Sequence, residues 1–274
     1  MDSFPEVPYI KFLKEEQVIN NNRGRVYGIQ GTLYPNVATA YEIDDLGLYM
    51  PIFINNFTEF FNKIVNPDYF TGDFFPALRQ NIDFKNEMLN ILNLEYLLLP
   101  AELYIDDSNW KQIYSGEVNI YRNIRALPRV FIVHRAVCLK SNRETLDFLK
   151  QNPENLNKIC VIYDEEIPGK PDLPPDDSKA WIIQYDTDEV NINASMKKAG
   201  FLIFNDIYYP GWKVFVDNKE EKIYRTNFLF RSVFLKEGNH TVRFVFFPYS
   251  YYGGKIISLA VIYMLFVMIG KREK

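Results

Sequence analysis

The sequence predicts an α+β N-terminal part, then an all-β, jelly-roll-like sandwich, and last one transmembrane helix. Helical and extended patterns alternate through residues 1–163, whereas strand-like segments alone follow one another through 180–248. Residues 256–270 contain no charged side chain. Many short strands at regular spacing are typical of a β-sandwich. The expected parts are an α+β domain at 1–163, a proline-rich and acidic linker at 164–179, the sandwich at 180–248, a membrane helix at 251–270 and a charged tail at 271–274.

The N-terminal part mixes both kinds of element. Apolar residues at helical spacing predict helices, and short β-branched or aromatic runs predict strands. The segment from Ser141 to Glu144 has the spacing of a capping box, so a helix should start there and end near Lys150. Further helices are expected at 8–16, 53–65 and 85–92, strands at 25–28 and 96–99, a hairpin at 112–114 and 118–122, and an extended segment at 127–133.

The predicted sandwich is a series of short strands separated by turns. Pro210-Gly211 predicts a sharp turn, because proline presets φ at one corner and glycine accepts a positive φ at the next. Asp217-Asn218-Lys219 predicts the turn that follows. The expected strands are 180–185, 189–194, 201–205, 213–216, 221–225, 230–235 and 240–246.

The apolar C-terminal segment predicts a membrane span. The uncharged core is short for a bilayer, but Tyr251, Tyr252 and Lys255 extend it, because tyrosine and lysine favour the interface. A buried helix of a soluble domain is the alternative, and the lysine-rich end argues against it. Cations at 271–274 would lie in the cytoplasm by the positive-inside rule, which places the bulk of the chain outside the cytoplasm.

That orientation requires an export element, and the first residues lack the features of a secretory signal. Two alternatives remain open. The chain is the C-terminal region of a larger polytopic protein, or it is anchored by its tail with its bulk in the cytoplasm. The positive-inside rule favours the first.

Composition and motifs exclude several functions. A net charge of −4 and the absence of a basic stripe argue against nucleic acid as a partner. The sequence has no glycine-rich phosphate loop, and its two histidines are too few for most metal or triad sites. We therefore expect no catalytic residue, no metal and no cofactor. Cys138 and Cys160 are expected to be buried free thiols, although a disulfide between them is geometrically feasible.

Aromatic residues make up 16% of the chain, and a flat ring offers apolar area to a sugar at low entropic cost. Tyr208, Tyr209 and Trp212 are therefore glycan-binding candidates, and Arg231 is a candidate for an anionic group. The alternatives are a tryptophan in the sandwich core and a structural arginine with a partner. The acid pairs, such as Asp44-Asp45, are expected to solvate loops.

The chain has the pattern Asp-x-Tyr-Tyr-Pro-Gly-Trp at 206–212, and the upstream segments 25–28, 34–36, 92–96 and 120–129 add to it. Together they resemble the YfhO family of bacterial membrane proteins. One departure is Asn218, where the family usually has glycine; asparagine also tolerates a positive φ. Further matching positions, for which we expect structural roles, are Asp206, Pro210, Gly211, Asp217, Asn227, Gly238, His240 and Pro248, with Gly254 in the helix.

The resemblance implies a glycosyltransferase of the GT-C type in the bacterial cytoplasmic membrane. Such an enzyme is expected to use a sugar linked to polyprenyl phosphate and to modify a cell-envelope glycopolymer. The implied partners are the lipid bilayer, a multi-helix membrane core in the same or a separate chain, and an envelope glycan. The family's catalytic acid lies in that core, so this region is expected to bind acceptor or to be architectural. The alternatives are a non-catalytic membrane-anchored scaffold and a self-contained enzyme.

Overall fold

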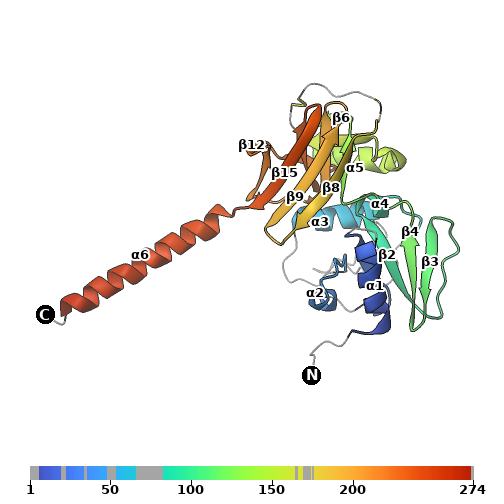
Figure 1. Ribbon diagram of the computed structural model, residues 1–274, viewed down its shortest axis with the longest axis horizontal. Helices are drawn as coiled ribbons and strands as arrows, with labels where there is room; N and C mark the ends of the chain where they lie inside the picture. Colours follow the sequence, from blue (N-terminus) through green and yellow to red (C-terminus); the bar gives the residue numbers. More distant parts are fainter. Residues whose placement is uncertain are drawn as a thin grey trace.

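The computed structural model describes residues 6–19, 23–33, 36–47, 54–65, 83–163, 166–168, 174 and 176–272. It has three β-sheets, helices mainly in the first half, and one long helix at the C-terminus that projects away from the folded body (Figure 1). The predicted fold class is confirmed: an α+β part, a sandwich-like β part and one apolar C-terminal helix.

A four-stranded sheet organises the N-terminal part, with the order β1-β2-β4-β3 and β1 parallel to β2. The central strand β2 is buried along nearly all of its length, and its side chains alternate between two cores. Tyr96 and Leu98 pack with Ile10 and Leu13 of α1, whereas Leu97 faces the opposite core. The elements are α1 (Pro8–Ile19), β1 (Arg25–Gly28), α2 (Val37–Ala40), α3 (Asn55–Phe60), a π-helical turn (Phe61–Val65), α4 (Met88–Ile91), β2 (Leu94–Pro100), β3 (Trp110–Ser115) and β4 (Val118–Asn123).

Two further sheets face each other as the sandwich. One has the order β5-β10-β14-β13-β7-β6 and the other β12-β11-β15-β9-β8. Leu202 and Phe204 of β10 pack against Ile192 of β9 and Phe244 of β15 in the core between them. The strands are β5 (Val130–Val133), β6 (Arg135–Leu139), β7 (Ile159–Tyr163), β8 (Lys179–Tyr185), β9 (Glu189–Met196), β10 (Gly200–Ile207), β11 (Trp212–Val216), β12 (Lys219–Glu221), β13 (Tyr224–Thr226), β14 (Phe230–Leu235) and β15 (Gly238–Phe246).

The six-stranded sheet takes strands from both sides of the expected linker. β5 pairs with β10, and β7 pairs with β13, so segments before residue 164 and after residue 179 share one hydrogen-bonded sheet. The chain also crosses between the two sheets within the expected strand 221–225. β12 pairs with β11 in one sheet, whereas β13 pairs with β14 in the other, so two short strands replace the predicted one.

Three other local expectations need correction. The helix expected at 85–92 is only α4, because the Asn86 side chain accepts a hydrogen bond from the Met88 amide and delays its start. The helix expected at 53–65 is α3 followed by the π-helical turn, and Phe53 lies outside the described residues. Both cysteines are free thiols, but Cys138 is exposed on β6 whereas Cys160 is buried.

The capping box predicted at Ser141 is present. The Ser141 hydroxyl accepts from the Glu144 amide, and the Glu144 carboxylate accepts from the Ser141 amide at the start of α5 (Asn142–Gln151). Ser141→Ala should lower the free energy of unfolding by about 1 kcal/mol, because one helical amide loses its acceptor. Urea unfolding followed by circular dichroism measures this loss. Ser115→Ala, at an exposed strand end, is the matched control, and an equal effect in both variants would refute the assignment.

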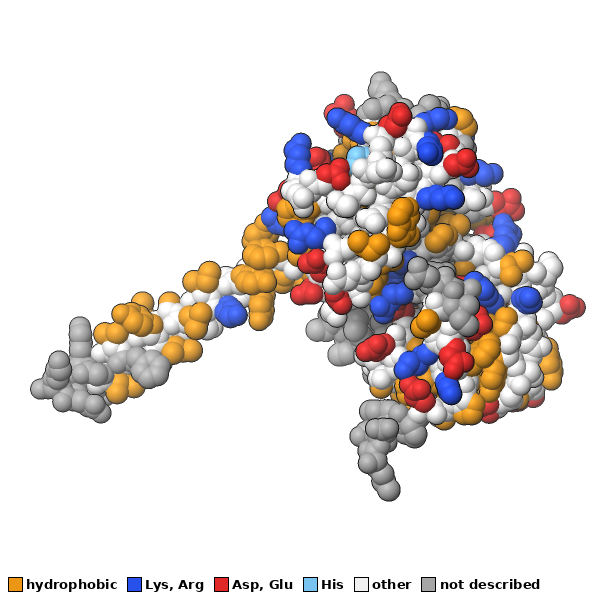
Figure 2. All heavy atoms as spheres, in the orientation of Figure 1, with side chains coloured by type: hydrophobic (Ala, Val, Ile, Leu, Met, Phe, Trp, Pro, Cys, Tyr) orange, Lys and Arg blue, Asp and Glu red, His pale blue; other side chains and the backbone are white. Residues whose placement is uncertain are grey.

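The C-terminal helix α6 (Tyr249–Arg272) follows β15 after only Phe247 and Pro248. Its stretch from Tyr249 to Ile269 is long and apolar enough to cross a bilayer, and the side chains described in that stretch are exposed. Most of its described side chains are apolar and exposed, and Figure 2 shows many of them along the helix. The helix expected at 251–270 is therefore present as a candidate membrane span.

Candidate functional site

The candidate site is centred on Asp206, near the end of β10. The pairing of β10 with β14 shifts register between Phe204 and Ile207, which marks a β-bulge at Asn205-Asp206. A bulge re-aims the side chain that follows it. The Asp206 carboxylate accordingly meets groups from elements that are far apart in the sequence.

Four side chains donate hydrogen bonds to the Asp206 carboxylate. Oδ1 accepts from Arg25 Nη2 at 2.9 Å and from Arg129 Nε at 2.9 Å. Oδ2 accepts from the Tyr185 hydroxyl at 2.7 Å and from Arg231 Nη2 at 3.1 Å. These donors come from β1, the residue before β5, the end of β8 and β14, so one carboxylate joins the N-terminal sheet to both sheets of the sandwich.

A second carboxylate extends the cluster. Asp44 Oδ2 lies 3.3 Å from Arg129 Nη1 and 3.5 Å from Arg23 Nε. The guanidinium groups of Arg23 and Arg129 also lie over the Tyr185 ring, at 4.4 and 5.2 Å from its centroid. The cluster is therefore a continuous network of paired charges that packs around one aromatic ring.

Burial and the charges of this network together shift its pKa values. Burial alone would raise the pKa of Asp206, but Arg129, Arg231 and Arg25 outweigh burial and hold that pKa well below its usual range. Burial, reinforced by Asp206, raises the pKa of Tyr185 to about 12. Burial lowers the pKa of Arg25 and of Arg231 to about 10. At neutral pH the carboxylate and the guanidinium groups are therefore all charged.

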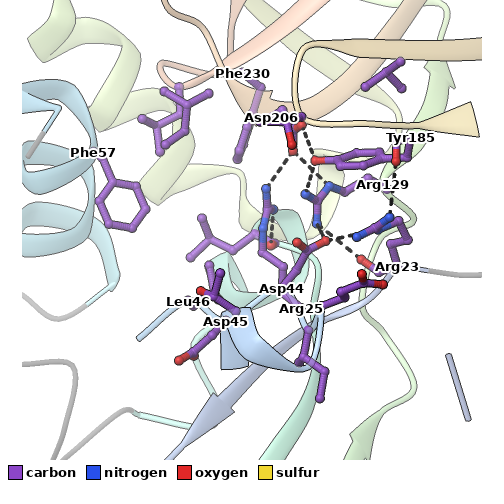
Figure 3. A pocket seen from close by; sticks show the side chains of 18 of the residues that line it. Arg23, Arg25, Asp44, Asp45, Leu46, Phe57, Arg129, Tyr185, Asp206 and Phe230 are labelled. Atoms are coloured by element: carbon purple, nitrogen blue, oxygen red, sulfur yellow. Dashed lines mark hydrogen bonds and ion pairs between the residues drawn. The ribbon is translucent and has the colours of Figure 1, made fainter. Parts of the chain in front are cut away.

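A pocket of about 700 Å³ opens beside the network. One wall is charged and carries Arg23, Arg25 and Arg129 together with Tyr185 and Asp206 (Figure 3). Apolar residues complete the lining: Figure 3 shows Phe57 and Leu46 on the side away from Tyr185, and Phe230 near Asp206. Its other acidic lining residues are Glu42, Asp44, Asp45 and Asp186. No group of acidic, histidine and cysteine side chains able to hold a metal ion occurs in the described part of the chain.

The four predicted binding residues occupy different positions. Trp212 lines the pocket and is partly exposed. Arg231 lies behind it, only 2% exposed, with its guanidinium 3.8 Å from the centroid of the Trp212 ring. Tyr209 is 48% exposed and lies near Phe246, whereas the Tyr208 amide donates to Leu229; neither tyrosine lines the pocket.

Arg231 has an unusual environment for a buried cation. Its Nε and Nη1 have no hydrogen-bond partner among the described residues, although Nη2 is paired with Asp206. The aromatic rings of Trp212 and Phe204 lie on it and offset part of the cost through cation–π attraction. Arg231 therefore supports the Trp212 ring from behind.

The residues expected to have structural roles occupy turns and strand ends. Gly211 has φ 104°, as the second corner of the Pro210-Gly211 turn requires. Asp217 and Asn218 both have positive φ in the two-residue loop between β11 and β12, so asparagine does replace glycine there.

The other expected structural residues follow the same pattern. Asp217 accepts from His240 Nδ1 and from the Thr241 amide, which ties the β11–β12 loop to β15. Asn227 has φ 47° and its side chain accepts from the Val161 amide of β7. Gly238 has φ 131° at the start of β15, and the Pro248 carbonyl accepts from the first turn of α6.

The sequence did not predict the roles of Arg25, Arg129, Tyr185 and Asp44. Arg25 and Arg129 stand at the ends of apolar segments, and an arginine beside a buried strand is a signal for a buried partner. Tyr185 ends a predicted strand and carries no comparable signal. Asp44 and Asp45, which the sequence predicts to solvate a loop, both line the pocket.

Comparison with known proteins finds a match for the region that contains Asp206 and some of its partners. Residues 177–258 match the family model described as "Bacterial membrane protein YfhO". Over this region the chain is similar to the YfhO family. The YfhO region covers β8 to β15 and the start of α6, and so includes Tyr185, Asp206, Trp212 and Arg231. No curated protein and no solved structure matches the chain.

The family description and α6 agree with each other. The family consists of bacterial membrane proteins, and the chain has a candidate membrane span directly after the YfhO strands. A lipid bilayer therefore fits this protein as its environment.

Proposed function

We propose that this chain is the membrane-anchored ectodomain of a YfhO-like glycosyltransferase of the GT-C type, and that it holds an envelope glycan while sugar transfer takes place in a separate membrane core. The donor would be a sugar linked to polyprenyl phosphate. The bulk of the chain would lie outside the cytoplasm, with Lys271 and Arg272 on the cytoplasmic side of the bacterial membrane.

The observation that carries this proposal is the mixed charged and aromatic lining of the pocket. Its volume of about 700 Å³ is in the range of small-molecule and oligosaccharide sites. Each sugar hydroxyl both donates and accepts a hydrogen bond, so it suits a wall on which guanidinium donors alternate with carboxylate acceptors. The apolar faces of sugar rings suit the aromatic area that Trp212, Phe57 and Phe230 add to the lining.

The charge balance supports a hydroxyl-rich ligand over a strongly anionic one. The lining contains three arginines, and it contains five acidic residues: Glu42, Asp44, Asp45, Asp186 and Asp206. Because the acids outnumber the arginines, an anionic ligand would meet net repulsion.

The location of the pocket also supports the proposal. Asp186 and Thr187, which line it, belong to the β8–β9 turn, and the Asp188 carbonyl of that turn accepts from Phe246 at the end of β15. The pocket therefore lies close to the point where α6 begins. A glycan held there would be presented close to the bilayer, where a membrane core could act on it.

Trp212→Ala should weaken binding of a matching oligosaccharide about tenfold, which corresponds to about 1.4 kcal/mol, because the ligand loses its aromatic platform. Screening a panel of defined oligosaccharides by calorimetry against the full chain in detergent, and then comparing variants, measures this. Trp181→Ala is the matched control, since Trp181 is 45% exposed on β8 and does not line the pocket.

A second variant separates binding from folding. Trp212→Phe keeps a ring over Arg231, so it should preserve the thermal midpoint while it weakens binding less than alanine does. If Trp212→Ala leaves both the oligosaccharide affinity and the thermal midpoint unchanged, the assignment of Trp212 to a glycan-binding site is wrong. The purified chain alone should transfer no sugar.

An architectural role is the second candidate, and the Asp206 network favours it. Most donors of the network are already satisfied within the protein, and the network joins all three sheets. A scaffold of this kind would bind no oligosaccharide of the panel, and Trp212→Ala would change only stability.

A further inference from the structure

The end of the sandwich next to α6 carries a group of aromatic side chains that we call the aromatic collar: Tyr209, Phe247, Tyr249, Tyr251 and Tyr252. Four of them lie within the six residues 247–252. Tyr209 comes from the Pro210-Gly211 turn between β10 and β11, and the fold brings it to the same end.

The rings of the collar pack on one another around the start of the helix. Phe247 stacks on Tyr252, with centroids 4.2 Å apart and planes 11° apart, and meets Tyr249 edge to face at 5.3 Å. Tyr251 and Tyr252 meet at 5.4 Å. These contacts fix the first turn of α6 relative to the end of β15.

The Pro210-Gly211 turn is held against this same point. The Phe247 amide donates to the Gly211 carbonyl at 2.6 Å. The ring centroids of Tyr209 and Trp212 lie 6.4 and 5.3 Å from that of Phe246. A side chain at Gly211 would come within 3.0 Å of the Phe246 ring and 3.3 Å of Pro248, so the approach is close. The turn and the start of the helix therefore form one surface.

The collar is exposed although it is aromatic. Tyr209 is 48% exposed, Tyr249 64%, Tyr251 61% and Tyr252 39%. Figure 2 shows apolar side chains gathered where α6 leaves the body. Two lysines border the collar: Lys213 Nζ lies 5.6 Å from the centroid of the Tyr249 ring, and Lys255 is exposed one turn further along α6. Aromatic rings with polar tips, flanked by lysines, are the composition of a membrane–water interface.

The length of α6 restricts how far the aromatic collar can lie from the bilayer surface. At 1.5 Å per residue, the helix from Gly253 to Gly270 spans roughly 27 Å, slightly less than the ~30 Å hydrocarbon core of a bilayer. A span without excess length draws its flanking residues to the interface. Only Phe247 and Pro248 separate β15 from α6, so no linker lets the sandwich move away from the surface.

We propose that the aromatic collar is a membrane-interface contact that holds the end of the sandwich in the lipid headgroup layer, with the Pro210-Gly211 turn touching the bilayer. The occupant is the lipid surface itself, because the collar is continuous with the candidate membrane helix. Tyr209 would then contact lipid, whereas Trp212, three residues later in the chain, lines the pocket.

The test places a fluorescent label at one position at a time in the full chain, in lipid nanodiscs. Cys138→Ser removes the exposed thiol, whereas Cys160 is buried and burial raises the pKa of its thiol, so it should not react. An environment-sensitive nitrobenzoxadiazole label is attached after Tyr209→Cys, after Tyr251→Cys or after Lys197→Cys. Lys197 follows Met196, which pairs with Gly238 at the opposite end of β15, roughly 27 Å from the collar.

The fluorescence emission of the label at Tyr209→Cys should be shifted to the blue. It should lose intensity when the nanodisc contains lipid with a spin label near its headgroup, and iodide in solution should quench it only weakly. The Lys197→Cys label should behave as in water, and the Tyr251→Cys label should report whether α6 is inserted. Pro210→Cys probes the same turn if the Tyr209 variant does not fold. The proposal is overturned if the turn is as open to iodide as Lys197, or if Tyr251 is not quenched by the lipid. Neither result depends on glycan binding.

Discussion

Asp206→Asn should lower the free energy of unfolding by about 3–5 kcal/mol, because it leaves buried arginines without their shared countercharge. The carboxylate is the common acceptor for Arg25, Arg129 and Arg231, whose side chains are 12%, 5% and 2% exposed. Asparagine is nearly the same size, so the effect reports charge rather than volume. Chemical unfolding of the full chain in detergent, followed by tryptophan fluorescence, measures it.

Asp186→Asn is the matched control for this substitution. Asp186 lines the same pocket but accepts from the exposed Gln184 side chain, so its loss should change stability by no more than about 0.5 kcal/mol. If the two asparagine variants are equally stable, the Asp206 network does not hold the sheets together.

The pH dependence provides an independent check of the same network. The pKa of Asp206 is depressed in the folded protein, so its stabilising contribution is present above the unfolded value of about 3.9 and is lost as pH falls toward the folded value. The stability difference between the wild type and Asp206→Asn should therefore be constant near neutrality. It should shrink progressively below about pH 4.

The sequence predicts local elements well where the pattern is local. The alternation in 230–235 gives β14 with its observed bounds, and Ser141 with Glu144 gives the start of α5. The segment 221–225 shows why other predictions fail. Its split into β12 and β13 depends on partners in two different sheets, and one partner of β13 is Ile162 of β7. No pattern within five residues contains that information.

The site likewise could be predicted only where its signal is local in the sequence. Trp212 stands out in the sequence as a tryptophan after a Pro-Gly turn, and it does line the pocket. The partners of Asp206 are separated from it along the chain by distances from 21 residues for Tyr185 to 181 for Arg25. Each is an ordinary charged or phenolic residue at a strand end, and only the folded chain shows that they meet.

The second large effect is expected at Phe60, in the core that joins the N-terminal part to the sandwich. Phe60 is fully buried on α3, stacks on Phe228 at 6.2 Å and meets Phe230 of β14 edge to face at 6.5 Å. Phe60→Ala should lower the free energy of unfolding by about 3–5 kcal/mol, because it leaves a cavity among side chains from both halves of the chain. Tyr104→Ala, at a site 72% exposed, should change it by no more than about 0.5 kcal/mol.

The number of transitions in the unfolding curve of Phe60→Ala tests whether the N-terminal part and the sandwich unfold together. Phe60 contacts residues after 227, and β5 and β7 hydrogen-bond to β10 and β13, so the segments on either side of 164–179 share both a core and a sheet. The wild type and Phe60→Ala should therefore each unfold in one transition, and fluorescence and circular dichroism should give the same midpoint. Two separate transitions, with only one shifted by Phe60→Ala, would instead mean that the YfhO region is stable without the N-terminal part. In that case Arg25 and Arg129 could not be required for its fold.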